Sequence, residues 1–116
     1  MREKVRDKGR LEHIVEAIAH VKEFVGESEF EDFRHDKLRL YATIYNVQIV
    51  GEAVYKLSAD FKGTHQEVPW RLIEKMRHIL VHDYFQINDD ILWSVIKDDL
   101  PELEKHVTEY LLSMDS

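Results

Sequence analysis

The chain has 116 residues, of which 44% are hydrophobic and 34% charged, and its formal net charge is -7. This length supports one hydrophobic core, so we expect a single domain over residues 1–116. With no cysteine in the sequence, disulfides, thiolate metal sites and cysteine nucleophiles are excluded. The first residues lack the apolar core of a secretory signal, and no stretch reaches the ~20 apolar residues of a membrane span. We therefore expect a cytoplasmic protein with no membrane contact.

The first predicted helix begins near Asp7, a suitable N-cap, and stops at Gly26. Its apolar residues have the three-four spacing of one helix face: Leu11, Ile14, Val15, Ile18, Val21 and Val25. A polar, acidic stretch follows, in which Phe30 and Phe33 are the expected anchors. A long helix is then predicted over about residues 36–59.

Apolar residues spread almost all the way round this long helix, which is typical of a helix in the middle of a bundle. Gly51 within it costs about 1 kcal/mol relative to alanine, so we expect a close helix crossing there. The following segment, residues 60–67, has the composition of a loop.

Pro69 suits the first turn of a third helix, whose predicted buried stripe is Trp70, Ile73, Met76, Leu80 and Val81. A fourth helix is predicted to begin near Asn88 or Asp89, and Pro101 is expected to break it and start a fifth. The sequence thus predicts an all-α fold, an up-and-down bundle of four or five antiparallel helices.

Four residues that can carry chemistry crowd one end of the third helix: Arg77, His78, His82 and Tyr84. On a regular helix Arg77 and His82 point about 140° apart, so one chain places them on opposite walls of a groove. A second copy related by a two-fold axis would supply the opposite wall of each groove. The spacing therefore favours a homodimer.

Cleavage of RNA without a metal needs a base for the 2'-hydroxyl proton, an acid for the leaving 5'-oxygen and a cation beside the phosphorus. Histidine and arginine suit these roles. The pattern R-x4-H is weak by itself, and the alternative is a basic last turn that complements the helix dipole. His78 and His82 could also share a zinc ion, but no H-E-x-x-H arrangement accompanies them, so we expect no metal and no cofactor.

Charge is distributed unevenly around this cluster. Residues 62–82 hold four cations against two acids, a net charge of +2, whereas residues 83–104 hold one lysine against seven acids, a net charge of -6. A polyanion is expected to approach the first segment. The alternative is that both segments are merely solvated helix faces.

The run PWRLIEKMRHILVHDYFQINDDILW resembles the signature of HepT-like proteins in the HEPN superfamily, R-x4-H-x-Y followed by an Ile-Asn step and a tryptophan-bearing helix. Arg77, His82 and Tyr84 match the motif, and Trp93 follows it. Gly51-Glu52-Ala53 also resembles the family's G-E-A, and the resemblance extends from about Asp7 to Leu111. One departure is His78, where the family commonly has asparagine.

The resemblance implies a homodimeric toxin that cuts tRNA or mRNA with Arg77 and His82, supported by His78, in a cleft shared by two copies. It also implies a minimal nucleotidyltransferase antitoxin, encoded beside it, that attaches AMP to Tyr84. Two alternatives stay open: a non-catalytic HEPN partner that scaffolds a nucleotidyltransferase, and a member that keeps the fold alone. For Tyr84 the alternative is an aromatic residue that packs at the helix end.

Overall fold

We analysed a computed structural model, which describes the backbone of residues 2–75 and 88–114 and the side chains of residues 6–75 and 88–114. Within these residues every regular element is a helix. The all-α prediction is thereby confirmed for the described part of the chain. No described helix is both long enough and apolar enough to cross a membrane.

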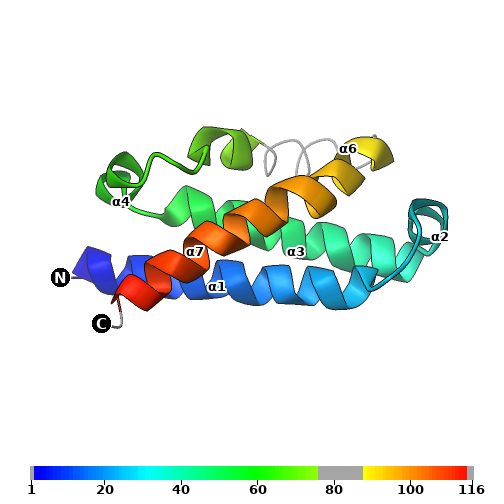
Figure 1. The fold of residues 1–116 in the computed structure, drawn as a ribbon, viewed down its shortest axis with the longest axis horizontal. Coiled ribbons are helices and arrows are strands. Elements are labelled where there is room, and N and C mark those ends of the chain that lie inside the picture. Colours follow the sequence, from blue (N-terminus) through cyan, green and yellow to red (C-terminus); the bar gives the residue numbers. More distant parts are fainter. Residues whose placement is uncertain (1, 76–87, 115–116) are drawn as a thin grey trace.

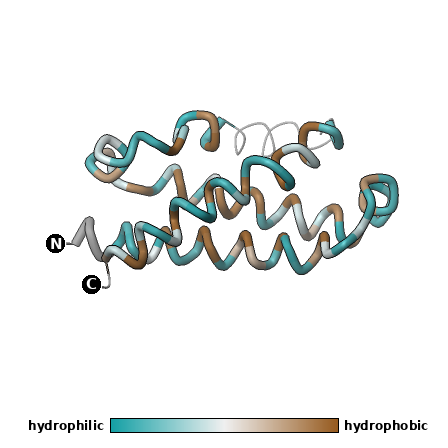
Figure 2. Tube along the Cα trace, in the orientation of Figure 1, coloured by the Kyte–Doolittle hydropathy of each residue, from teal (hydrophilic) through white to brown (hydrophobic). Residues whose placement is uncertain are grey.

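Two long helices form the base of the fold. α1 (Arg2–Val25) and α3 (Lys37–Lys56) lie antiparallel and side by side along the long axis of the molecule (Figure 1). Polar and apolar residues alternate along both of them (Figure 2), as expected for helices that bury one stripe. The buried stripe of α1 consists of residues that are at most 3% exposed: Leu11, Ile14, Ile18, Val21 and Val25. Five of the six residues of the predicted core face are therefore buried, and the sixth, Val15, is half-buried.

The connection between α1 and α3 contains a short helix, α2 (Phe30–His35). Gly26 ends α1 in the left-handed conformation, with φ of 53°, which glycine adopts without steric cost. In α2, Phe33 is 1% exposed and is a true anchor. α3 then begins after Asp36, whose carboxylate accepts a hydrogen bond from the backbone N–H of Arg39 at 3.2 Å. These boundaries agree with the sequence prediction.

The expected N-cap role of Asp7 is wrong. α1 begins at Arg2, and Asp7 lies within it, only 5% exposed. Its carboxylate accepts hydrogen bonds from the backbone N–H of Ser58 at 2.8 Å and from the Ser58 hydroxyl at 2.7 Å. The Ser58 hydroxyl oxygen in turn accepts from the N–H of Phe61 at 3.1 Å. Asp7 thus supports the start of a different helix, a tertiary role that local sequence signals do not reveal.

That helix is α4 (Ala59–Thr64), which occupies most of the segment predicted to be a loop. Ser58 caps it, and Phe61, 7% exposed, fixes it to the core. Gly63 lowers the helix propensity of this segment. The Ser58 cap and the buried Phe61 nevertheless stabilise its six residues as a helix. Residues 70–75 are then helical, after Pro69 as predicted.

The predicted break at Pro101 is also wrong. α6 (Asp89–Ser94) passes through a π-helical turn (Val95–Asp99) into α7 (Leu100–Met114) without a loop (Figure 1). The N–H of Leu100 donates to the carbonyl of Val95, five residues earlier. This wider turn immediately precedes Pro101 and accommodates a residue that has no N–H to donate. α7 then runs back across α1, so that the end of α7 lies at the same end of the molecule as the start of α1 (Figure 1).

The expectation that α3 lies in the middle of the bundle holds for part of its surface. One face is buried, with Val47, Val50 and Val54 fully inaccessible, and Gly51 is buried as well. The opposite face is exposed along the length of the helix.

Candidate functional site

The four residues singled out by sequence, Arg77, His78, His82 and Tyr84, lie in the segment 76–87, outside the described residues. The structure does describe the residues on both sides of that segment. These two flanks are anchored to the rest of the fold by different means.

The leading flank is the helical segment 70–75. Trp70 is 6% exposed and Ile73 8%, so both face the core as predicted. The indole N–H of Trp70 donates to the carbonyl of His65 at 2.8 Å, which satisfies its polar edge within the fold. The interpretation of Trp70 as a packing residue is supported by this contact.

Lys62 ties the leading flank to α3. Its ammonium lies 2.7 Å from the carboxylate of Glu74 and also donates to the carbonyls of Val54 and Tyr55, at 3.3 and 3.4 Å. Those carbonyls belong to the last turn of α3, where the helix dipole favours a cation. The side chains of Lys62 and Glu74 are 21% and 28% exposed, so solvent screens the pair only in part. One lysine thus joins three helical segments, and its partner Glu74 lies three residues before Arg77 in the sequence.

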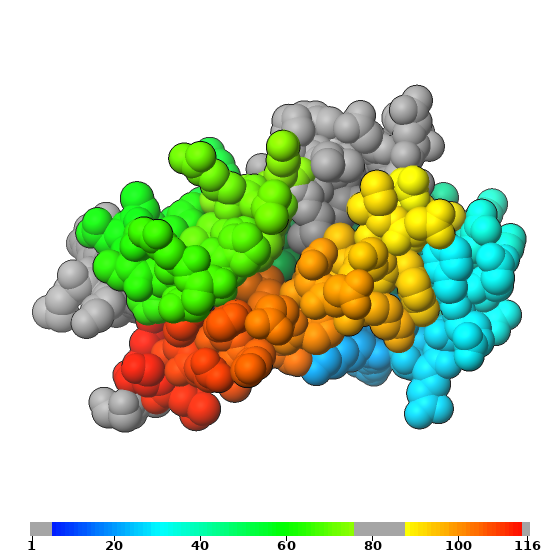
Figure 3. All heavy atoms as spheres, turned by 45° about the horizontal axis from the view of Figure 1, so that its top comes forward, coloured from blue at the N-terminus to red at the C-terminus, as the bar shows by residue number. Residues whose placement is uncertain are grey.

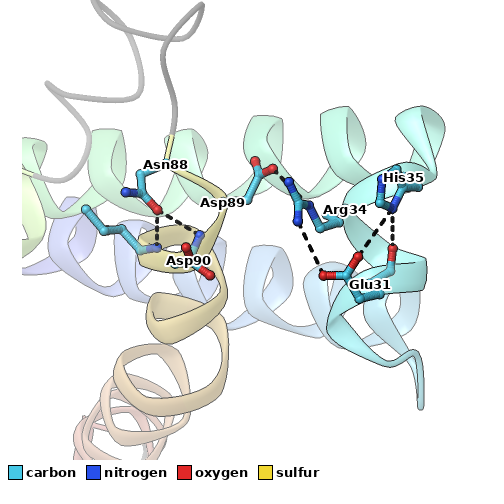
Figure 4. A network of polar contacts seen from close by, with 7 residues as sticks. Glu31, Arg34, His35, Asn88, Asp89 and Asp90 are labelled. Carbon is cyan, nitrogen blue, oxygen red and sulfur yellow. Dashed lines mark hydrogen bonds and ion pairs between the residues drawn. The ribbon is translucent and has the colours of Figure 1, made fainter.

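The trailing flank begins at Asn88, whose side-chain oxygen accepts from the N–H groups of Asp90 and Ile91 at 2.9 and 3.2 Å. The predicted N-cap is therefore confirmed. Next to it, Asp89 lies 3.6 Å from the guanidinium of Arg34 on α2. Figure 4 shows Arg34 between Asp89 on α6 and Glu31 on its own helix, with Asn88 facing the first turn of α6.

An aromatic cluster reinforces the same flank. The ring of Trp93 packs against Phe30 and Phe33, at centroid distances of 5.5 and 5.2 Å. The ammonium of Lys97 lies 4.7 Å from the centre of the Trp93 ring. Trp93, which carried part of the family resemblance, is thus a packing residue that fixes α6 to α2.

A second polar cluster, which sequence reasoning missed, joins the segment after α4 to α7. The Tyr110 hydroxyl donates to the carboxylate of Glu67 at 2.6 Å, and the ring of His65 meets the Tyr110 ring edge-on at 4.6 Å. Figure 3 shows the two segments in contact along one face of the molecule. Tyr110 and Glu67 are far apart in sequence, so spacing offers no sign of their pairing.

Burial, followed by the hydrogen bond to Glu67, raises the pKa of Tyr110 well above its ordinary value. The same hydrogen bond lowers the pKa of the Glu67 carboxyl. Tyr110 is therefore held neutral, as a hydrogen-bond donor rather than a nucleophile. The cluster anchors the residues that lead into the helix at 70–75.

No group of three His, Asp or Glu side chains among the described residues is arranged to hold a metal ion. The alternative that His78 and His82 share a zinc ion concerns residues outside the described part of the chain. The described flanks supply packing and ion pairs on either side of segment 76–87.

Comparison with known proteins identifies the family. Residues 14–110 match the model of the ribonuclease HepT-like family. A probable ribonuclease HepT of Thermococcus cleftensis is 43% identical over 97 residues, which are 84% of this chain and 88% of that protein. A putative RNase of Caldanaerobacter subterraneus subsp. tengcongensis is 42% identical over 101 residues, 87% of this chain and 90% of that protein.

A putative RNase of Methanocaldococcus jannaschii is 35% identical over 100 residues, 86% of this chain and 92% of that protein. No solved structure matches the chain at a comparable level. Because the family match spans most of the sequence and the relatives align over most of their own lengths, the chain belongs to the family of HepT-like ribonucleases.

Proposed function

We propose that this chain is a metal-independent endoribonuclease that cleaves RNA with Arg77 and His82, supported by His78. The observation that carries the proposal is the family match, whose span of residues 14–110 includes the whole motif segment. The two anchored flanks support it as well. Catalysis needs side chains on a well-supported frame, and ion pairs, a helix cap and aromatic packing support the residues on both sides of segment 76–87.

In the proposed reaction, the His82 imidazole takes the proton of a ribose 2'-hydroxyl. The 2'-oxygen bonds to phosphorus as the bond from phosphorus to the 5'-oxygen breaks, and the 5'-oxygen leaves with a proton that a protonated side chain donates as the general acid. The guanidinium of Arg77 stabilises the charge that develops on the phosphoryl oxygens. The products are a 2',3'-cyclic phosphate and a free 5'-hydroxyl.

We place the reaction in a cleft shared by two copies of the chain. Arg77 and His82 point about 140° apart on a regular helix, so neither copy alone brings them together across one phosphate. In a two-fold dimer, Arg77 of one copy and His82 of the other complete each half of the cleft.

The test is incubation of the purified protein with tRNA or mRNA in the presence of EDTA. We expect cleavage by the unmodified protein and its loss in Arg77→Ala and His82→Ala. The matched control is His35→Ala, because the His35 side chain on α2 is 71% exposed and lies outside the motif. Intact RNA with the unmodified protein, or equal cleavage by all variants, would refute the proposal.

We further propose that the protein is the toxin of a toxin–antitoxin pair and that a nucleotidyltransferase antitoxin neutralises it by adding AMP to Tyr84. On a regular helix Tyr84 falls within about 20° of Arg77. A phosphodiester there would add negative charge beside the arginine and repel the RNA phosphates.

The test is co-expression with the neighbouring nucleotidyltransferase, followed by mass spectrometry of the intact protein and of its peptides. The chain supplies internal controls, since Tyr41, Tyr45 and Tyr55 are 61%, 64% and 59% exposed. AMP on Tyr84 alone is the expected result. AMP on the exposed tyrosines instead would contradict a site-specific switch, and a stable complex without modification or RNA cleavage would favour a scaffold.

A further inference from the structure

The leading flank carries two cations that face solvent, Arg71 and Lys75. Neither has a hydrogen bond or an ion pair in the part of the chain that the structure describes. They lie four residues apart in one helical segment, so their side chains are neighbours on the same face. Figure 3 shows side chains of this yellow-green segment projecting from the surface. We call Arg71 and Lys75 the flank pair.

The acids nearest to the flank pair in the sequence are engaged elsewhere. Glu74, which precedes Lys75, has its carboxylate 2.7 Å from the ammonium of Lys62. Glu67 accepts the hydrogen bond of the Tyr110 hydroxyl on α7 at 2.6 Å. Lys62 thus neutralises the one acid of the leading flank, and the positive charge of the flank pair is left uncompensated.

Cations elsewhere in the described chain commonly pair with a carboxylate, as do Lys22, Arg34, Arg39 and Lys56. Such pairs form readily in a chain with 23 acidic residues against 16 lysines and arginines. The flank pair instead places two like charges at a spacing where they repel each other, which disfavours a helix slightly. An anion outside the chain therefore explains these two charges better than the stability of the fold does.

The spacing of the flank pair continues into the motif. Intervals of four, three and four residues connect four positions: Arg71, Lys75, His78 and His82. On a regular helix these positions fall within an arc of about 60°. The two histidines lie outside the described residues, so this relation is a property of the sequence pattern. Measured along a regular helix, Lys75 precedes His82 by about 10 Å and Arg71 precedes it by about 16 Å.

The anion that suits the flank pair is a chain of phosphates. A guanidinium can donate two parallel hydrogen bonds to one phosphate, and an ammonium can bind a second phosphate as a point charge. The trailing side of the motif disfavours the same ligand, because residues 83–104 carry a net charge of -6. An RNA strand that reacts at His82 is therefore attracted toward the flank pair.

We propose that Arg71 and Lys75 bind two phosphates of the RNA strand on one side of the bond that is cleaved. They act as a binding subsite for the strand and take no part in the chemical step. This inference rests on the proposed function, because it places the subsite relative to the reaction at His82. It also gives the Lys62–Glu74 ion pair a second role, which is to keep a carboxylate away from the RNA phosphates.

The salt dependence of RNA binding tests the proposal directly. The probe is a fluorescently labelled single-stranded oligoribonucleotide with 2'-O-methyl groups, which lacks the 2'-hydroxyl that the proposed reaction needs. Each phosphate contact with a single strand adds about 0.7 to the slope of log Kd against log salt concentration. Arg71→Gln with Lys75→Gln is therefore expected to lower that slope by about 1.4. Between about 50 and about 200 mM salt, the wild type should lose about seven-fold more affinity than this variant.

The matched control is Lys37→Gln with Lys105→Gln, which changes the net charge by the same amount. Both lysines are exposed, on α3 and α7, and neither has a partner among the residues that the structure describes. This control is expected to keep the wild-type slope.

The exchange Arg71→Lys with Lys75→Arg keeps both charges and is also expected to keep the wild-type slope. A wild-type slope in the glutamine variant of the flank pair, or an equal fall in the lysine control, would overturn the proposal.

The kinetics of tRNA cleavage separate binding from chemistry. A contact that is equally strong in the ground state and the transition state changes KM and leaves kcat unaltered. We expect the glutamine variant of the flank pair to raise KM and to keep the kcat of the wild type. A lower kcat with an unchanged KM would place the flank pair in the chemical step and overturn its role as a binding subsite.

Failure of this inference differs from failure of the proposed function. If the wild type leaves RNA intact but the slope falls as expected, the proposed reaction is refuted and the phosphate contacts stand. If RNA is cleaved and the slope does not change, the flank pair is refuted as a subsite and the reaction stands. Unchanged RNA binding, together with weaker binding of the neighbouring nucleotidyltransferase, would assign the flank pair to a protein partner instead.

Discussion

Replacing Lys62 with methionine tests whether the leading flank is held as the structure indicates. The change keeps most of the aliphatic stem but removes the ammonium that contacts Glu74 at 2.7 Å and two carbonyls of the last turn of α3. Exposed ion pairs contribute about 0–1 kcal/mol, and breaking a fully buried pair costs about 3–5 kcal/mol. At 21% and 28% exposure this pair lies between these limits, so we expect Lys62→Met to lower the free energy of unfolding by about 1–2 kcal/mol.

The assay is urea unfolding followed by tryptophan fluorescence, with RNA cleavage measured on the same preparation. The control is Lys56→Met, which removes a lysine that lies 3.2 Å from Glu52, with both side chains about half exposed (47% and 48%). That variant is expected to change the free energy of unfolding by about 0.5 kcal/mol or less. We also expect Lys62→Met to cleave RNA more slowly under conditions where it stays folded. Equal stability and equal cleavage in the two variants would refute the role given to Lys62.

Three further changes probe other parts of the molecule. Asp7→Ala, which leaves the N–H and hydroxyl of Ser58 without their acceptor, is expected to cost about 2 kcal/mol in urea unfolding, and a loss below about 0.5 kcal/mol would contradict that role. The raised pKa of Tyr110 means that the folded chain keeps a proton which the unfolded chain loses, so stability should fall as pH rises above about 10. The lowered pKa of Glu67 should cause a loss of stability as pH falls below about 4.5. Tyr110→Phe should weaken both losses of stability, at high and at low pH. If its free energy of unfolding has the same pH dependence as that of the wild type, the Tyr110–Glu67 pair is not their source. Tyr84→Phe is expected to cleave RNA but to resist neutralisation by the antitoxin, so loss of its activity on co-expression would argue against Tyr84 as the switch.

Local signals in the sequence predicted the long helices well, because the spacing of apolar residues and the caps Asp36 and Asn88 act within a few residues. Contacts between residues far apart in the sequence were missed, because no local pattern indicates them. Asp7 has the side chain of a cap, but its partner Ser58 lies 51 residues away. Pro101 has the signature of a helix break, yet a π-helical turn carries the helix past it.

The chemistry of the site was predicted from a motif of four residues, whereas the contacts that hold its flanks were not. Lys62 and Glu74 are ordinary charged residues in sequence, and only the fold brings them to 2.7 Å. The exposed face of α3 shows a related limit. Its apolar residues were predicted to be covered, and within one copy of the chain they are not.

The claim that two copies share one cleft can be tested by mixing inactive variants. Arg77→Ala and His82→Ala, each without cleavage activity alone, are unfolded together, refolded and assayed with RNA in EDTA. In a mixed dimer, one half of the cleft regains an intact arginine from one chain and an intact histidine from the other. We predict recovery of up to about a quarter of wild-type activity, because half of the dimers are mixed and each has one complete half-site. A mixture as inactive as its two components would contradict the shared cleft.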